Sequence, residues 1–131
     1  MIPRLDHREP VSETVQRYVR DLHALGFEGE IHCDDASRTV LSTDNSIYQV
    51  YPQVVVFPKD HEDLCSIVRA AHDHEVTLYP RGGGTGTNAQ SLGAGVVVDT
   101  SKHTTRILEI NVEERWARVQ CGAVKDHLNA E

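Results

Sequence analysis

Residues 80–99, PRGGGTGTNAQSLGAGVVVD, place four glycines within five positions and then continue into valines. Glycine has no Cβ atom, so consecutive glycines leave backbone N–H groups open to a ligand and permit positive φ angles. Such a run of N–H groups can surround an anion, typically a phosphate. A glycine-rich turn that binds nothing would have the same composition, so the neighbouring segments must decide between the two interpretations.

Two common phosphate-binding motifs do not fit this loop. Gly84, Gly86 and Ala89 match the GxGxxA spacing of a dinucleotide-binding fold, but that motif must open a helix. Only residues 90–94 separate the loop from the next apolar run, and they are too few for that helix. The GK[ST] signature of a P-loop is absent. The sequence therefore predicts that residues 80–91 connect two strands, with several glycines at positive φ.

The segments around the loop predict the elements that would hold it. VVVF at 54–57, VTLY at 76–79 and GVVVD at 95–99 predict strands of one sheet. The segment 60–74 predicts a helix capped by Asp60. Its expected buried face comprises Leu64, Ile67, Val68 and Ala71. RILEI and RWARVQCG predict a hairpin that turns at Asn111–Glu114. We expect a small α/β (α+β) unit with a helix packed on its sheet.

The two ends of the chain carry weaker patterns. Ser12 and Gly26 suit the start and the stop of a first helix. Its apolar positions recur at helical spacing: Val11, Val15, Tyr18, Val19, Leu22 and Leu25. Residues 28–53 are polar, with a short strand expected near Thr39–Leu41 and turns at 42–46. GAVKDHLNAE at the end begins an amphipathic helix with Val124 and Leu128.

Composition excludes several classes of protein. With 131 residues, 39% of them hydrophobic, the chain suits one domain or one fragment with a real core. No apolar stretch is long enough to span a bilayer, and the net charge of −7 argues against broad nucleic-acid binding. Cys33, Cys65 and Cys121 show no CxxC spacing, which disfavours a disulfide framework or a metal site. We expect a soluble, cytoplasmic protein.

The histidines do not form a convincing site. His72 and His74 lie two residues apart on a predicted helix, so they face different directions and make a poor metal pair. His103 follows the third strand, where it could approach a ligand, but it has no identified partner. Asp99 is expected to cap the turn at TSK, residues 100–102.

The glycine loop resembles a known family of flavoproteins. YPRGGGTGTNAQSL is similar to the pyrophosphate-binding loop of the p-cresol methylhydroxylase and vanillyl-alcohol oxidase fold. Residues 51–124 look like the opening of the FAD-binding domain of FAD-linked oxidases that act on D-2-hydroxyacids. STDNSIYQVYP and ERWARVQCG look most like the large bacterial flavin and iron–sulfur dehydrogenases related to D-2-hydroxyglutarate dehydrogenase, glycolate oxidase and D-lactate dehydrogenase.

The resemblance implies a set of FAD-binding residues. The backbones that it places around the pyrophosphate are those of Gly82, Gly83, Gly84, Thr85, Gly86 and Thr87, bordered by Asn88, Gln90 and Ser91. Arg81 either pairs with a phosphate or braces the strand ends. Gly122 falls where the family brings backbone against the flavin ring, while Cys121 continues the inward alternation of Ala117 and Val119. No histidine lies between Pro80 and Ser91, so we expect non-covalent FAD.

The resemblance also implies how the protein is organised. Residues 1–51 would form a helical amino-terminal lead-in, and residues 52–131 an FAD-binding domain whose second subdomain is truncated. A substrate domain and any iron–sulfur cysteines would lie beyond Glu131. The complete protein would oxidise a small D-2-hydroxyacid by hydride transfer to FAD, while this piece alone would be inactive and could self-associate near Ala117 and Val119. The alternative is a free-standing small α/β binding or interaction module without redox chemistry.

Overall fold

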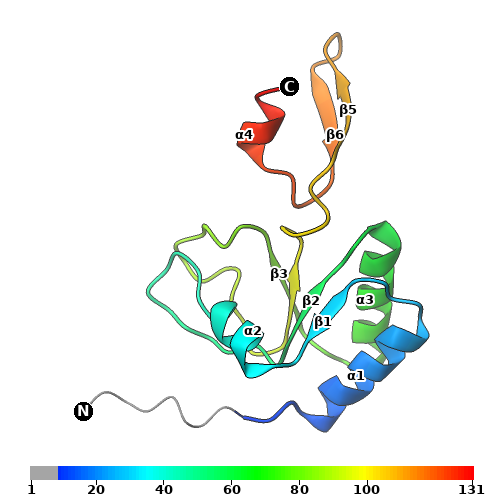
Figure 1. The fold of residues 1–131 in the computed structure, drawn as a ribbon, viewed down its shortest axis with the longest axis vertical. Helices are drawn as coiled ribbons and strands as arrows, with labels where there is room; N and C mark the ends of the chain where they lie inside the picture. The colour runs from blue at the N-terminus through cyan, green and yellow to red at the C-terminus, as the bar shows by residue number, and fades with distance from the viewer. Residues whose placement is uncertain (1–8) are drawn as a thin grey trace.

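The computed structural model describes residues 9–131, which form a four-stranded sheet with helices and a separate hairpin (Figure 1). In chain order the elements are α1 (Glu13–Ala24), β1 (Glu30–His32), α2 (Asp35–Val40), β2 (Val54–Phe57), α3 (His61–Asp73), β3 (Leu78–Arg81), β4 (Val96–Asp99), β5 (Ile107–Asn111), β6 (Trp116–Val119) and α4 (Lys125–Leu128). The mixed α/β architecture predicted from the sequence is confirmed.

The sheet has the strand order β1-β2-β4-β3. Strands β2 and β3 both run parallel to β4, and β1 pairs antiparallel with β2. The three strands predicted to share a sheet therefore do so, although β3 begins two residues later than VTLY. Valines fill the two central strands because a parallel strand is covered on both faces. Pro80 is tolerated in β3 because β3 lies at the edge of the sheet.

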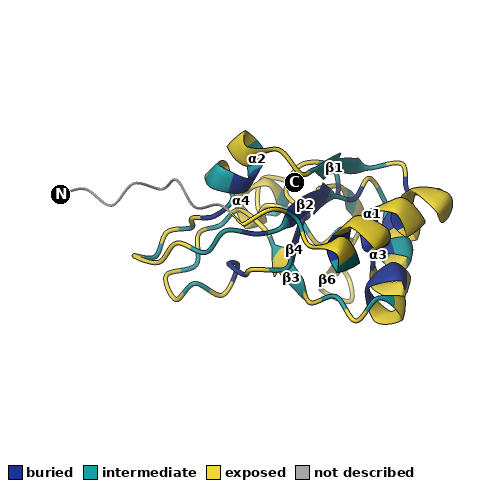
Figure 2. Ribbon diagram, turned by 90° about the horizontal axis from the view of Figure 1, so that it is seen from below, coloured by how far each residue is buried: buried dark blue, intermediate teal, exposed yellow. Residues whose placement is uncertain are grey.

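Helices α1 and α3 pack together against the sheet, and Figure 2 shows buried residues concentrated where they meet it. The core joins side chains of both helices to the central valines: Val15, Tyr18, Leu22, Ile67, Ala70, Ala71, Val54, Val56, Val96 and Val98. The predicted caps are present, since Ser12 accepts a hydrogen bond from the Val15 N–H and Asp60 accepts one from the Asp63 N–H.

One face of α3 was predicted only in part. Ile67 and Ala71 are buried as expected and Leu64 is half-buried, but Val68 is 60% exposed, so its predicted burial was wrong. Ala70 takes the buried position instead. Leu64 and Val68 lie at the margin of the helix face, where they line an open apolar groove rather than the core.

The expected strand near Thr39–Leu41 was wrong, because this segment belongs to α2. Asp34 caps that helix by accepting a hydrogen bond from the Ser37 N–H at 2.9 Å. Arg38 is buried and donates from Nε to the Pro52 carbonyl at 2.8 Å, which fixes the helix against the start of β2. The capping and the buried arginine outweigh the weak strand preference of Thr39 and its neighbours.

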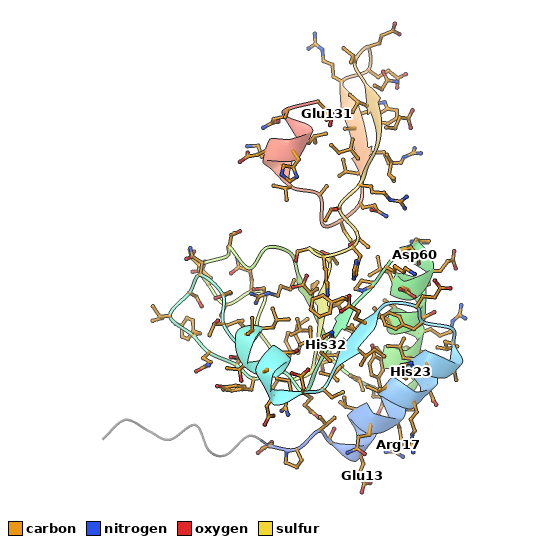
Figure 3. All side chains as sticks on the ribbon, viewed as in Figure 1. Glu13, Arg17, His23, His32, Asp60 and Glu131 are labelled. Carbon is orange, nitrogen blue, oxygen red and sulfur yellow. The ribbon has the colours of Figure 1, made fainter. Side chains whose placement is uncertain are left out.

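The β5–β6 hairpin and α4 project away from the sheet (Figures 1 and 3), and most of their side chains are exposed. The predicted turn after Asn111 is confirmed. The hairpin exposes several large apolar residues: Leu108, Ile110, Val112, Trp116 and Val119. Ala117 and Val119 are exposed, so the apolar surface near them is uncovered, as expected for this chain. Cys121 is exposed too, so its predicted inward packing was wrong. No helix within residues 9–131 is long and apolar enough to cross a membrane.

A candidate cofactor site at the glycine loop

The glycine loop leaves the carboxyl end of β3 at Arg81 and returns to the amino end of β4 at Val96. No helix intervenes between these two parallel strands, which confirms the prediction and removes the dinucleotide-fold interpretation. The loop therefore presents its own backbone, rather than a helix amino terminus, at the carboxyl edge of the sheet.

Only one glycine in the loop needs a positive φ. Gly84 has φ +66°, and the remaining positive φ of this loop belongs to Ala89 at +58°. The prediction of several such glycines was wrong. Gly93 instead permits close packing, since a Cβ there would overlap the Tyr79 ring. Around Gly82 the space is open, and a Cβ on Gly83 would meet only the Thr85 Cγ2 atom at 3.7 Å.

The amides of this loop are available to a ligand. Within residues 9–131, the N–H groups of Gly82–Thr87 donate no hydrogen bond to another protein group. The run ends at Asn88, whose N–H donates to the Gln90 side chain at 3.0 Å. Unpaired donors beside open space at two glycines fit a ligand with several acceptor oxygens, such as a diphosphate. The residues present therefore fit the pyrophosphate of FAD.

Of the two roles expected for Arg81, the structure shows contacts of the second kind, in which the side chain braces the strand ends. Its Nη1 atom donates to the Thr43 carbonyl at 2.9 Å, and its Nε atom lies 3.7 Å from Asp99 Oδ2. The side chains of Arg81 and Asp99 are 10% and 5% exposed, so the pair is largely removed from water. Asp99 also accepts hydrogen bonds from Ser101, the turn cap that the sequence predicted.

Gly122 lies at the base of the hairpin, against Thr100 and Thr104. Its N–H donates to the Thr104 carbonyl at 2.9 Å, and a Cβ would overlap the Thr100 carbonyl oxygen. Close backbone packing at the base of the hairpin therefore requires glycine here, independently of any flavin.

An open groove of about 460 Å³ joins the beginning of the loop to the base of the hairpin. Arg81 and Gly82 line it together with Cys121, and the remaining lining residues are mostly apolar. Sequence reasoning treated Cys121 only as a packing residue. Cys121 lies beside the loop only because segments far apart in the chain contact each other, and the sequence offers no local signal for such contacts.

His74 and His103 each contact a carboxylate of a distant segment. His74 Nε2 lies 2.6 Å from Asp21 Oδ2, and His103 Nε2 lies 2.7 Å from Glu30 Oε1. Hydrogen bonds from Lys102, His103 and His32 lower the pKa of Glu30 to about 2. Within residues 9–131, no group of three or more His, Cys, Asp or Glu side chains could hold a metal ion.

Comparison with known proteins identifies the family. Residues 52–131 match the family model described as FAD binding domain. The chain belongs to this family. It is 53% identical to the D-2-hydroxyglutarate dehydrogenase of Pseudomonas putida over 99% of its length, and 48% identical to that of Haemophilus influenzae over 98%. It is also 34% identical to the glycolate oxidase subunit GlcD of Bacillus subtilis over 76% of its length, which is 22% of that relative.

The chain spans about 13% of the length of the two dehydrogenases. Among solved structures, the FAD-family domain described here superimposes on an alkyldihydroxyacetonephosphate synthase with a TM-score of 0.79 and 22% identity, over 95% of this chain and 25% of the other. It superimposes on p-cresol methylhydroxylase with a TM-score of 0.74 and 16% identity, over 92% of this chain and 25% of the other. These structures confirm the predicted p-cresol methylhydroxylase-type fold.

Proposed function

We propose that this chain is the FAD-binding part of a longer flavin-dependent dehydrogenase that oxidises a D-2-hydroxyacid. The observation that carries the proposal is the run of unpaired amides over Gly82–Thr87 in a loop between parallel strands. The similarity to the two D-2-hydroxyglutarate dehydrogenases supports the substrate class and makes D-2-hydroxyglutarate the first candidate.

The residues of this chain bind and orient FAD rather than perform proton transfer. The Gly82–Thr87 amides would donate to the two phosphates, which Asn88, Gln90 and Ser91 would border. Arg81 holds the start of the loop through the Thr43 carbonyl and Asp99, and its guanidinium lies beside Gly84. Gly122 would approach the flavin ring across the groove that Gly82 and Cys121 share. Residues 9–51, which precede the matched residues 52–131, contribute α1, β1 and α2.

FAD, when bound, supplies a two-electron acceptor for the hydride that leaves C2 of the hydroxyacid. We assign no residue of this chain to the hydroxyl proton or to the substrate carboxylate. The loop has no histidine between Pro80 and Ser91, which supports non-covalent binding of FAD. We infer that the substrate-binding residues, and any iron–sulfur cluster, belong to the rest of the complete protein.

The proposal is tested with the complete protein that carries this segment. We expect a purified yellow protein with a flavin absorption spectrum, and release of the flavin into the supernatant after acid precipitation. Anaerobic addition of D-2-hydroxyglutarate should bleach the spectrum, while the L-enantiomer should not. A protein that binds no flavin after incubation with FAD would favour the alternative, a binding or interaction module without redox chemistry.

A further inference from the structure

Three consecutive residues, 43–45, each contact a different part of the glycine loop. The contacts join Arg81 Nη1 to the Thr43 carbonyl at 2.9 Å, the Asn45 N–H to the Gly84 carbonyl at 3.0 Å, and Ser91 Oγ to Asp44 Oδ2 at 3.1 Å. They therefore hold the loop at its beginning, its middle and its end. Residues 43–45 precede the part of the chain that matches the family model. The sequence analysis placed them in a turn of the lead-in and used them for the family resemblance, but gave them no role at the glycine loop.

The contact in the middle of the loop orients one of the free amides. In a trans peptide the C=O and the N–H of the same unit point in opposite directions. The Gly84 carbonyl points toward Asn45, so the N–H of Thr85 points away from residues 43–45. Thr85 is exposed, so an amide in this orientation is available to a ligand on the side of the loop opposite to residues 43–45.

Residues 43–45 are themselves held firmly. Thr43 and Gln49 form an isolated antiparallel β-bridge, and the Val50 N–H donates to the backbone carbonyl of the buried Ser42 at 2.9 Å. Asp44 Oδ1 accepts a hydrogen bond from the Ser46 N–H at 2.8 Å, which leaves Oδ2 for the loop. Hydrogen bonds from Ser46 are the main cause that lowers the pKa of Asp44, so its carboxylate is ionised at neutral pH.

We propose that residues 43–45 position the glycine loop for a diphosphate group, with Asp44 as the positioning residue that joins the loop's end to this segment. The proposal rests on the proposed function, because it assigns a purpose to the conformation of the same loop. Asp44 contacts protein groups only and is not expected to touch the cofactor.

The experiment compares Asp44→Ala with Asp44→Asn in the complete protein. Alanine removes both hydrogen bonds of the carboxylate, whereas asparagine can accept from the Ser46 N–H and donate to Ser91. We expect Asp44→Ala to raise the Kd for FAD about tenfold, the order of one hydrogen bond to a charged group. Asp44→Asn should restore most of the affinity. Asp73→Ala, which removes an exposed aspartate from the last turn of α3, is the matched control and should bind FAD as the wild type does.

Two further measurements separate positioning from simple stabilisation. The thermal unfolding midpoint of the apoprotein reports stability, and hydrogen–deuterium exchange of peptides covering 43–50 and 88–92 reports the contact itself. Faster exchange together with a raised Kd supports the proposal. A wild-type Kd in Asp44→Ala overturns it, whatever the unfolding midpoint, because a residue that only stabilises the fold would change the midpoint alone.

The same measurements cover the remaining outcomes. If Asp44→Ala does not fold, Ser91→Ala breaks the same hydrogen bond from the loop side, and an unchanged Kd there overturns the proposal. If the wild-type protein binds no FAD, the proposed function fails, and exchange in the apoprotein still decides whether residues 43–45 hold the loop. Unchanged exchange in both Asp44→Ala and Ser91→Ala would show that residues 43–45 do not hold the loop.

Discussion

Replacement of Gly83 by valine tests the cofactor site most directly, because the structure separates its effect on binding from its effect on folding. A Cβ at this position would meet only Thr85 Cγ2, at the ordinary contact distance of 3.7 Å. Gly83 is exposed and its φ is not positive, so the backbone accepts a side chain. The free energy of unfolding of the apoprotein should therefore change by no more than about 1 kcal/mol, since replacing a permissive glycine also restricts the unfolded chain.

Binding of FAD should fall much further. The new side chain occupies the open space beside the unpaired amides, so a diphosphate would lose its contact with about two or three of them. Each of these hydrogen bonds contributes a net roughly 1–1.5 kcal/mol, which gives a loss of about 2–4.5 kcal/mol and a Kd raised by about 30- to 2000-fold. Titration of the apoprotein with FAD, followed by flavin fluorescence, measures the Kd, and urea unfolding measures stability.

Two variants serve as controls for Gly83→Val. His72→Ala changes an exposed residue near the end of α3 and should leave the Kd unchanged. Gly84→Val should destabilise the apoprotein itself by about 1–2 kcal/mol or more, because φ is +66° and the Cβ would press on the Arg81 guanidinium. A Gly83→Val protein that keeps both its stability and the wild-type Kd would refute the assignment of the pyrophosphate to this loop.

Four further outcomes are expected. Tyr18→Phe should raise the free energy of unfolding in urea by about 1 kcal/mol, because the buried Tyr18 hydroxyl has no hydrogen-bond partner within residues 9–131. A lower free energy of unfolding would mean that the hydroxyl does have a hydrogen-bond partner. Gly122→Ala should cost about 1–3 kcal/mol, since the backbone carbonyls of Thr100 and Thr104 leave no room for a methyl group, and an unchanged thermal midpoint would contradict this packing. Glu30, whose pKa is lowered to about 2, stabilises the fold above its unfolded pKa, and this contribution disappears as pH falls from about 4.5 to about 2; urea titrations in that window should show a shallower acid dependence for Glu30→Gln. The isolated 131-residue chain should self-associate through the apolar hairpin in sedimentation experiments, bind FAD weakly and lack dehydrogenase activity, so submicromolar FAD binding by a monomer would contradict this expectation.

Local patterns in the sequence were sufficient to predict most of the elements. Ser12 and Asp60 mark helix starts because a side-chain cap acts within three residues, and the valine runs mark β2 and β4 because a covered parallel strand must be apolar. The absence of a helix after the loop was predictable because residues 90–94, which separate the loop from the next strand, are too few to form one. The glycines near residues 82–86 likewise identified the candidate site, since their effect on backbone access is local.

Long-range packing decided what these patterns could not. Only the fold places Val68 outside the core and puts Cys121 beside Gly82 in one groove. Residues 39–41 were expected to form a strand, but Arg38 and Thr39 belong to α2. The Arg38 guanidinium donates to the Pro52 carbonyl, and this long-range contact outweighs the weak strand preference of the segment. Asp44 meets Ser91 across 47 positions of the chain, so no periodicity or motif could indicate that a polar lead-in supports the glycine loop. Hydrogen bonds between distant segments form only when the whole sheet brings those segments together, and the conformation of the candidate site depends on them.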